Sequence, residues 1–324
     1  MDAVRKREKV LQTPSLEPFL QKVQARYHRL EWVHSDPIEF VLRFEDPWDQ
    51  EAVALVSAQL AYGNVKQIRK SIQGWLDRIQ AVTPSPASWV REGVWSPQKS
   101  RVLDDFVHRI HRGSDLLVLS RLQSKSWAQW GSLGAHLVSN LSSDAQNFAE
   151  ALNAVLAQWQ EWLREESGQK KPSRSVQHFL ASPDQGSCCK RWCMLLRWMG
   201  RKDEVDPGLW MKGSPLLQHL GVSVSAGKGL QPCQLVMPLD THVGTISQYL
   251  GLTDRKSLNW RAAVEITDRL REVSPEDPVR YDFALARLGI LDLCQKKFVK
   301  DICGNCMLLS ACRLAHRSIG TQMR

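Results

Sequence analysis

Apolar residues recur at helical spacing along most of the chain, and this pattern is the strongest constraint on its fold. The first such stripe consists of Leu16, Phe19, Leu20, Val23, Tyr27 and Leu30. No convincing run of alternating apolar and polar residues indicates strands. The sequence therefore predicts an all-α protein.

Turn and capping residues give approximate limits for the longer helices. The Asp46-Pro47-Trp48-Asp49 turn starts a helix that is expected to end at Gly63, and helices are also expected over 65–79 and 142–166. Proline and serine breaks at 83–88 and 93–100 precede a further helix that is expected to carry Val102, Phe106 and Ile110. The polar segment 165–175 is interpreted as a linker, and 201–238 as a long excursion without periodicity.

Length and charge narrow the protein class. A chain of 324 residues that is 43% apolar is expected to form about two domains. The formal net charge of +9 favours an anionic partner, with nucleic acid ahead of a membrane surface. No apolar run approaches the length of roughly 20 residues that spans a bilayer, and the first residues do not resemble a signal peptide. A cytoplasmic location without membrane partners is expected.

Four of the eight cysteines crowd the C-terminal segment, with the spacing Cys294-x8-Cys303-x2-Cys306-x5-Cys312. Thiolates at such spacing can hold a [4Fe–4S] cluster or a tetrahedral zinc ion. The uneven loops favour the iron–sulfur cluster, because structural zinc sites usually close with two short knuckles. Zinc and unligated core cysteines remain the alternatives. Core positions are expected for the other cysteines, which are Cys188, Cys189, Cys193 and Cys233.

Two segments upstream of the cysteines carry a family resemblance. MPLDTHVGTISQYLGL over 237–252 and DPVRYDFALARLGILDLC over 277–294 precede the four cysteines. This order resembles the endonuclease III branch of the helix-hairpin-helix DNA glycosylase superfamily over residues 236–313. The chain is also similar to a little-characterised bacterial family of conserved hypothetical proteins that shares its AYGNVKQI, GSxCKR and PLDTH segments. That family brings no established reaction with it.

The superfamily resemblance implies a fold with two lobes. Residues 36–205 would form a six-helix lobe with a degenerate helix-hairpin-helix, and residues 1–35 with 206–324 would form a second lobe. The second lobe would carry the cluster loop over 294–312. Damaged double-stranded DNA would bind across the cleft between the lobes, in the bacterial cytosol or nucleoid.

The resemblance also suggests residues that contact DNA. Ser57-Ala58-Gln59 is similar to a helix end whose glutamine fills the gap left by an extruded base, although an exposed helix residue is the alternative for Gln59. Pro183-Asp184-Gln185-Gly186 occupies the place of the hairpin, whose backbone amides would bind a phosphate; an ordinary turn is the alternative. The candidate DNA contacts are Gln59, Gly186, Ser187, Lys190, Arg191, Lys296, Lys297 and Lys300, and Tyr62 and Asn64 are candidates for lining the pocket.

Asp240 is the candidate catalytic carboxylate. Breaking a glycosidic bond passes through an oxocarbenium-like state that a carboxylate can stabilise. An aspartate at a helix start is also a favoured N-cap, and the two roles can coexist. The lysine that forms a Schiff base in bifunctional glycosylases is replaced by Cys188, and Lys190 would occupy its pocket only if the turn is remodelled.

The predicted function is therefore base excision by a monofunctional, water-using DNA glycosylase. One alternative is a catalytically inactive DNA- or RNA-binding protein on the same scaffold. A zinc-stabilised helical protein unrelated to DNA is a further alternative. The sequence identifies neither the lesion nor any protein partner.

Overall fold

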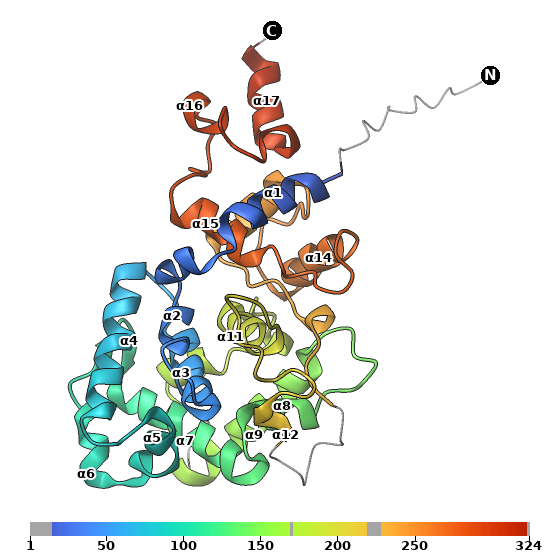
Figure 1. Cartoon of the computed structure of the whole chain (residues 1–324). Coiled ribbons are helices and arrows are strands. Elements are labelled where there is room, and N and C mark those ends of the chain that lie inside the picture. The colour runs from blue at the N-terminus through green and yellow to red at the C-terminus, as the bar shows by residue number, and fades with distance from the viewer. Residues whose placement is uncertain (1–14, 169–170, 219–227, 323–324) are drawn as a thin grey trace.

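The computed structural model describes residues 15–168, 171–218 and 228–322, and these residues are mostly helical (Figure 1). The all-α class predicted from the apolar spacing is therefore confirmed. Within the described ranges, no helix is both long enough and apolar enough to cross a membrane.

The helices follow one another with short connections. Those before residue 168 are α1 (Glu17–Tyr27), α2 (Ile38–Val41), α3 (Pro47–Gln59), α4 (Val65–Gln80), α5 (Pro86–Arg91), α6 (Pro97–Ser100), α7 (Gly113–Trp130), α8 (Leu133–Ser139) and α9 (Ala149–Ser167). Those after it are α10 (Arg174–Phe179), α11 (Lys190–Gly200), α12 (Pro215–Gln218), α13 (Thr241–Tyr249), α14 (Trp260–Arg271), α15 (Asp282–Ile290), α16 (Lys300–Cys303) and α17 (Arg313–Gln322). Short 3-10 turns are η1 (Leu30–Ser35), η2 (Gly93–Trp95), η3 (Arg101–Leu103), η4 (Pro183–Gln185), η5 (Pro232–Gln234) and η6 (Leu309–Ala311).

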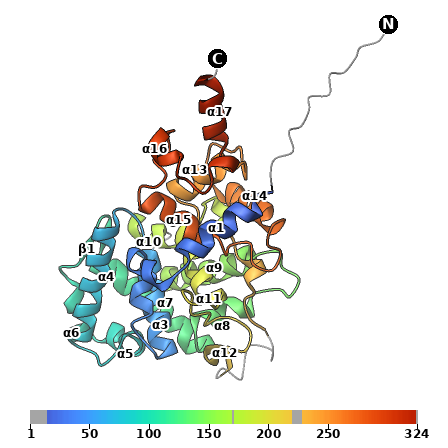
Figure 2. The same cartoon turned by 45° about the horizontal axis from the view of Figure 1, so that its top comes forward.

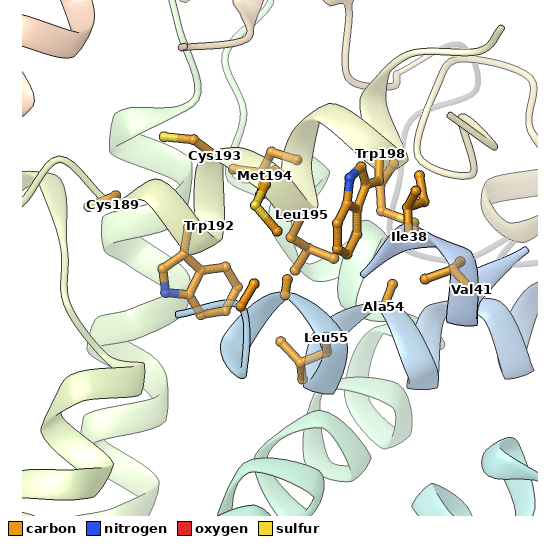
Figure 3. Packing of buried hydrophobic residues seen from close by; sticks show 14 of the residues in the cluster. Ile38, Val41, Ala54, Leu55, Cys189, Trp192, Cys193, Met194, Leu195 and Trp198 are labelled. Carbon is orange, nitrogen blue, oxygen red and sulfur yellow. The ribbon is translucent and has the colours of Figure 1, made fainter. Parts of the chain in front are cut away.

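Helix α3 is the centre of the fold. The Asp46 side chain caps it by accepting hydrogen bonds from the backbone amides of Trp48 and Asp49, at 2.9 and 3.0 Å. Its residues from Glu51 to Gln59 are all buried. Helix α11 packs along it, and Figure 3 shows Trp192 and Leu195 of α11 beside the α3 backbone. A helix covered on all sides has no polar stripe, which explains its nearly unbroken apolar sequence.

One continuous apolar core runs through the described residues, from Leu20 of α1 to Ala311 near the C-terminus. Helix α1 packs against α15, so the N-terminal helix lies beside the C-terminal helices in both cartoon views (Figures 1 and 2). Helices α16 and α17 lie at that end of the molecule, away from α5 and α6. The division into lobes 36–205 and 1–35 with 206–324 stays a prediction.

The prediction of a helix that carries Val102, Phe106 and Ile110 is wrong. Residues 101–103 form the 3-10 turn η3, and the chain continues into a short antiparallel hairpin of β1 (Val107–His108) and β2 (His111–Arg112). The hairpin buries the His108 and His111 side chains and leaves Ile110 53% exposed. Of the three apolar residues, Phe106 is buried and Ile110 is exposed, and the hairpin turns His108 and His111 inward instead, so the helical spacing was misleading.

The segment 201–238 is packed into the core where the structure describes it, rather than being a loose excursion. Trp210 and Leu230 are buried, and the indole Nε1 of Trp210 donates to Glu51 Oε1 at 2.6 Å. Glu51 also accepts hydrogen bonds from Trp127 Nε1 at 2.5 Å and from the backbone amides of Leu133 and Gly134, both at 3.0 Å. This buried carboxylate therefore joins α3 to α7, to α8 and to the irregular segment.

Candidate active site

A cavity of about 460 Å³ lies where five parts of the chain meet. Its walls come from residues 35–37, residues 61–68, residues 190–197 of α11, residues 238–243 and one side of α15. The volume falls in the range of small-molecule sites. Asp240 and Lys190, which the sequence analysis singled out as catalytic candidates, both line it.

Asp240 is at once a helix cap and a cavity residue. Its Oδ1 accepts hydrogen bonds from the backbone amides of His242 and Val243, each at 2.8 Å, at the start of α13. No hydrogen bond to Oδ2 is present among the described residues. The cap thus fixes the orientation of a half-buried carboxylate and leaves its second oxygen for a ligand.

Lys190 lies at the cavity, where it is the first residue of α11. The 3-10 turn η4 ends at Gln185 with Gly186 as its C-cap, and residues 187–189 are not helical. Cys189 adopts a left-handed backbone conformation with φ of 49°, and α11 begins only at Lys190. The Lys190 ammonium donates to the carbonyl oxygen of Ala61 at 3.0 Å. The amine is therefore held at the cavity wall.

The Gly186 amide is not free to bind a phosphate in this conformation. Gly186 has φ of +74°, and its N–H donates to the carbonyl oxygen of Pro183 at 2.8 Å, which closes η4. Ser187 pairs with Asn259 in an isolated bridge, and its hydroxyl accepts from the Cys189 amide at 3.2 Å. The prediction of a phosphate-binding hairpin is corrected for Gly186, because the turn uses that amide itself.

Gln59 and Arg191 are buried rather than placed on a DNA-facing surface. Gln59 is 0% exposed, and neither polar atom of its side chain has a partner among the described residues. Arg191 is 9% exposed and donates to the carbonyl oxygens of Gln59 and His178. Both predicted DNA contacts are corrected for this conformation, since the packing of α11 on α3 covers the two side chains.

The cavity wall contains a buried ionic network that the sequence did not indicate. Arg197 of α11 contacts Asp282 at 2.5 Å and Asp206 at 3.3 Å, and Arg287 contacts Asp36 at 3.0 Å. Burial raises the pKa of Asp282, and the charges of Asp240 and Asp36 add to this effect against the attraction of Arg197. The cavity wall therefore carries charges of both signs close together.

Tyr62 lines the cavity as the sequence suggested, whereas Asn64 caps α4 by accepting from the Lys66 amide at 2.9 Å. The Tyr62 ring makes edge contacts with His108, His111 and His178. Burial lowers the pKa of His111 to about 3 and that of His178 to about 4, so both imidazoles are neutral at pH 7. The imidazoles of His111 and His178 that pack against the Tyr62 ring are thus uncharged.

The four C-terminal cysteines are half-buried and lie within electrostatic reach of one another. Burial raises the pKa of Cys306, and Cys294, Cys312 and Cys303 add to the effect. The Cys303 thiol accepts a hydrogen bond from the Val299 amide at 3.4 Å. Amide donors to sulfur suit thiolates bound to iron.

No group of three or more His, Cys, Asp or Glu side chains in the described part of the chain is arranged to hold a single metal ion. A tetrahedral zinc site needs all its sulfurs about 2.3 Å from one point. In a four-iron cluster each thiolate binds a different iron, so the sulfurs need not converge on one point. The donor set of the four cysteines fits such a cluster.

The three lysines between the first two cysteines, Lys296, Lys297 and Lys300, are exposed. Lys300 begins α16, and the Lys296 ammonium lies 3.4 Å from the hydroxyl of Thr241, directly after Asp240. The loop between Cys294 and Cys303 therefore lies beside the start of α13.

Comparison with known proteins gives one match. Residues 36–291 match a family described as a protein of unknown function, DUF2400. The chain belongs to this family. No curated protein and no solved structure matches the chain.

The DUF2400 match contains Lys190, Asp240 and every other residue that lines the cavity except Ser35, and it ends three residues before Cys294. The cavity is therefore built almost entirely from residues inside the matched region. The four-cysteine segment lies C-terminal to the match.

Gly289 of α15 gives α13 the room to lie where it does. A Cβ atom at this position would lie 2.3 Å from Nδ1 of His242, two residues after Asp240. We expect Gly289→Ala to displace α13 and to lower the free energy of unfolding by about 2 kcal/mol, as overpacking usually does. Urea unfolding followed by circular dichroism measures the change.

The matched control for Gly289→Ala is Gly74→Ala in α4. A Cβ atom at Gly74 would meet only the flexible end of Arg78, at 3.3 Å, and alanine is the better helix former. This variant is expected to be as stable as the wild type or slightly more stable. Equal stability of both variants would contradict the close packing of α15 on α13.

Proposed function

We propose that the chain is a DNA glycosylase with a helix-hairpin-helix glycosylase fold, which removes a modified or mismatched base by hydrolysis of the N-glycosidic bond. The observation that carries the proposal is the placement of Asp240. Its carboxylate is held by the α13 cap at a cavity of about 460 Å³, with one oxygen unbonded within the described residues. A base extruded from the duplex needs such a pocket.

Asp240 supplies the negative charge that this reaction needs. As the glycosidic bond breaks, positive charge develops on the sugar, and a fixed carboxylate stabilises it and orients a water molecule. We propose water rather than Lys190 as the nucleophile, because the Lys190 side-chain nitrogen is engaged in a hydrogen bond to the carbonyl oxygen of Ala61. The enzyme is then monofunctional, without lyase activity.

DNA is proposed as the partner because the chain carries a net charge of +9 and exposes Lys297 and Lys300 in the loop whose Lys296 contacts the start of α13. Neutralised phosphates make affinity fall steeply with salt. A catalytically inactive binding protein on the same scaffold would show this salt dependence too. Only product formation separates the two functions.

Single-turnover incubation with a panel of duplexes tests the proposal. Each duplex carries one uracil, hypoxanthine, oxidised pyrimidine, oxidised guanine or mismatched base, and alkali reveals abasic sites. Release of at least one base is expected, without a covalent adduct when borohydride is added. Salt-dependent binding with no abasic site on any duplex would overturn the proposed activity, and an adduct that disappears in Lys190→Gln would overturn the choice of water.

A [4Fe–4S] cluster is proposed as the cofactor, with Cys294, Cys303, Cys306 and Cys312 as its ligands. Bound there, the cluster would supply a structural brace for a segment that has few buried residues of its own. Folding of the C-terminal segment would then depend on ligation of the four thiolates.

Anaerobic purification followed by iron and sulfide assays tests the cofactor. About four irons per chain are expected in the wild type. Cys303→Ser is expected to lose most of this iron. Cys233→Ser is the matched control, because Cys233 lies outside the segment and its thiol contacts Gln231. A colourless protein that contains zinc and no iron would contradict the cluster.

A further inference from the structure

Lys296 occupies an unusual place in the chain. It follows Cys294 by two residues, and its backbone is left-handed, with φ of 60°. This conformation is uncommon for a residue other than glycine and persists where the surroundings hold it in place. The contacts of Lys296 show what holds it.

Three groups of Lys296 contact three different partners. Its backbone N–H faces the thiol of Cys294 and acts on the pKa of that thiol against the larger effect of burial, which raises it. Its carbonyl oxygen accepts a hydrogen bond of 2.7 Å from the hydroxyl of Tyr249, and its ammonium lies 3.4 Å from the hydroxyl of Thr241. One residue therefore joins a candidate cluster ligand to two positions on α13.

Those two positions are the two ends of one helix. Thr241 is the first residue of α13 and Tyr249 is the last, and Asp240 is the N-cap. A helix of nine residues is about 13 Å long, and the long side chains of Lys296 and Tyr249 bridge this distance, so that one residue of the loop contacts both ends. The position of α13 thus depends on the conformation of this loop.

A second contact strengthens the far end of α13. Arg313 directly follows Cys312. Its guanidinium packs on Gly251, so closely that a Cβ atom at that position would lie only 2.4 Å from it. It also pairs with Asp254 at 2.9 Å. Two of the four cysteines therefore have a neighbour that contacts α13 or the turn after it.

We propose that Lys296 is a positioning residue that couples ligation of Cys294 to the placement of α13, and through α13 to the Asp240 carboxylate. Ligation of the four thiolates fixes the loop, and the fixed loop holds both ends of the helix. Loss of the cluster frees the loop and with it Lys296. The first turn of α13 and its Asp240 cap then open more often. The catalytic part of this inference rests on the proposed glycosylase activity, and the mechanical coupling rests on the proposed cluster but not on that activity.

Hydrogen exchange of the full-length chain tests the coupling without DNA. The protein is loaded with iron and sulfide under anaerobic conditions and compared with protein stripped by an iron chelator. Amides of residues 241–249 are expected to exchange at least about tenfold faster after stripping. Amides of α9 serve as the reference for global folding and are expected to be unchanged.

Variants identify the contacts that transmit the effect. Tyr249→Phe removes the hydroxyl that donates to Lys296, and about fivefold faster exchange of residues 241–249 is expected in the loaded protein, the usual effect of one hydrogen bond. Lys296→Met removes the longer contact of the ammonium with Thr241, and about twofold faster exchange of residues 241–249 is expected. Lys297→Met is the control, because Lys297 is an exposed neighbour with the same charge, and no change is expected.

The coupling must also act in the opposite direction, because linkage between two equilibria is reciprocal. Tyr249→Phe is therefore expected to bind iron about fivefold more weakly, measured as the iron retained at a fixed chelator concentration. Lys297→Met is expected to retain as much iron as the wild type.

Unchanged exchange of residues 241–249 in both the stripped protein and Tyr249→Phe would overturn the coupling. Equal iron retention in Tyr249→Phe and Lys297→Met would overturn it as well. Failure of the proposed function gives a different result, in which no base is released but exchange still depends on iron. Base release with iron-independent exchange would leave the proposed function standing and remove Lys296 as a positioning residue.

Discussion

Asp240→Asn is expected to slow base release by about 10²–10⁴-fold on a duplex that the wild type processes, the usual contribution of a positioned catalytic group. Asparagine keeps an oxygen for the hydrogen bonds from His242 and Val243, and it is as good an N-cap as aspartate. The variant therefore removes the negative charge and keeps the helix start. Single-turnover rates measure the loss.

Two measurements distinguish loss of chemistry from loss of structure in Asp240→Asn. The free energy of unfolding is expected to stay within about 0.5 kcal/mol of the wild type. Affinity for the same duplex at fixed salt is expected to remain within a few-fold. Asp254→Asn is the matched control, since Asp254 is an exposed carboxylate near the other end of α13, and its base release is expected to be normal. Undiminished base release by Asp240→Asn would show that another group is the catalytic carboxylate.

Glu51→Ala is expected to lower the free energy of unfolding by about 4 kcal/mol or more. The change leaves two indole N–H groups and two backbone amides without an acceptor. Glu51 is 0% exposed, so water does not replace the lost carboxylate. Glu51→Gln keeps one acceptor oxygen but turns an NH₂ group toward donors, and about 2–3 kcal/mol is expected. Urea unfolding gives both values.

The control for Glu51 is Glu276→Gln, because Glu276 is an exposed carboxylate, for which a change within about 0.5 kcal/mol is expected. If Glu51→Ala does not accumulate as folded protein, Glu51→Gln carries the test. A Glu51→Gln variant as stable as Glu276→Gln would mean that the four hydrogen bonds do not hold the segments together.

The sequence was most informative for features that depend on a few neighbouring residues, such as N-caps and helix starts. Asp240 was identified from its place at a helix start, and its cap is seen in the structure. The helical class followed from apolar spacing, and Asp46 and Pro47 correctly indicated the start of α3. These features depend on a few neighbouring residues, which a sequence displays directly.

Positions that depend on packing could not be read in the same way. Gln59 and Arg191 were expected at a surface, but α3 is covered on all sides and shows no polar face from which an outward position could be inferred. The charges of Arg197 and Asp282 are 85 residues apart in sequence, and only the fold reveals that they neutralise each other. Burial of a charge is decided by its partner rather than by its neighbours.

Lys190 shows a third limit. Its place in the cavity depends on whether the helix begins at residue 187 or three residues later, and helix ends are the least certain part of a sequence-based assignment. Cys189 is left-handed at the N-cap of α11, and Lys190, the first residue of the helix, lines the same cavity as Asp240. Nothing in the local sequence GSCCKR predicts the left-handed conformation of Cys189.

The contact between Glu51 and Trp210 has a consequence for synthesis of the chain on the ribosome. The two residues are 159 positions apart, so the acceptor emerges long before one of its donors exists. At about 5–20 residues per second, α3 waits at least several seconds before the native environment of its carboxylate can form. Such distant pairing also slows folding, because a long loop must close before its contacts are made. We therefore expect nascent chains that end before residue 210 to remain incompletely folded and to be the form most in need of chaperones.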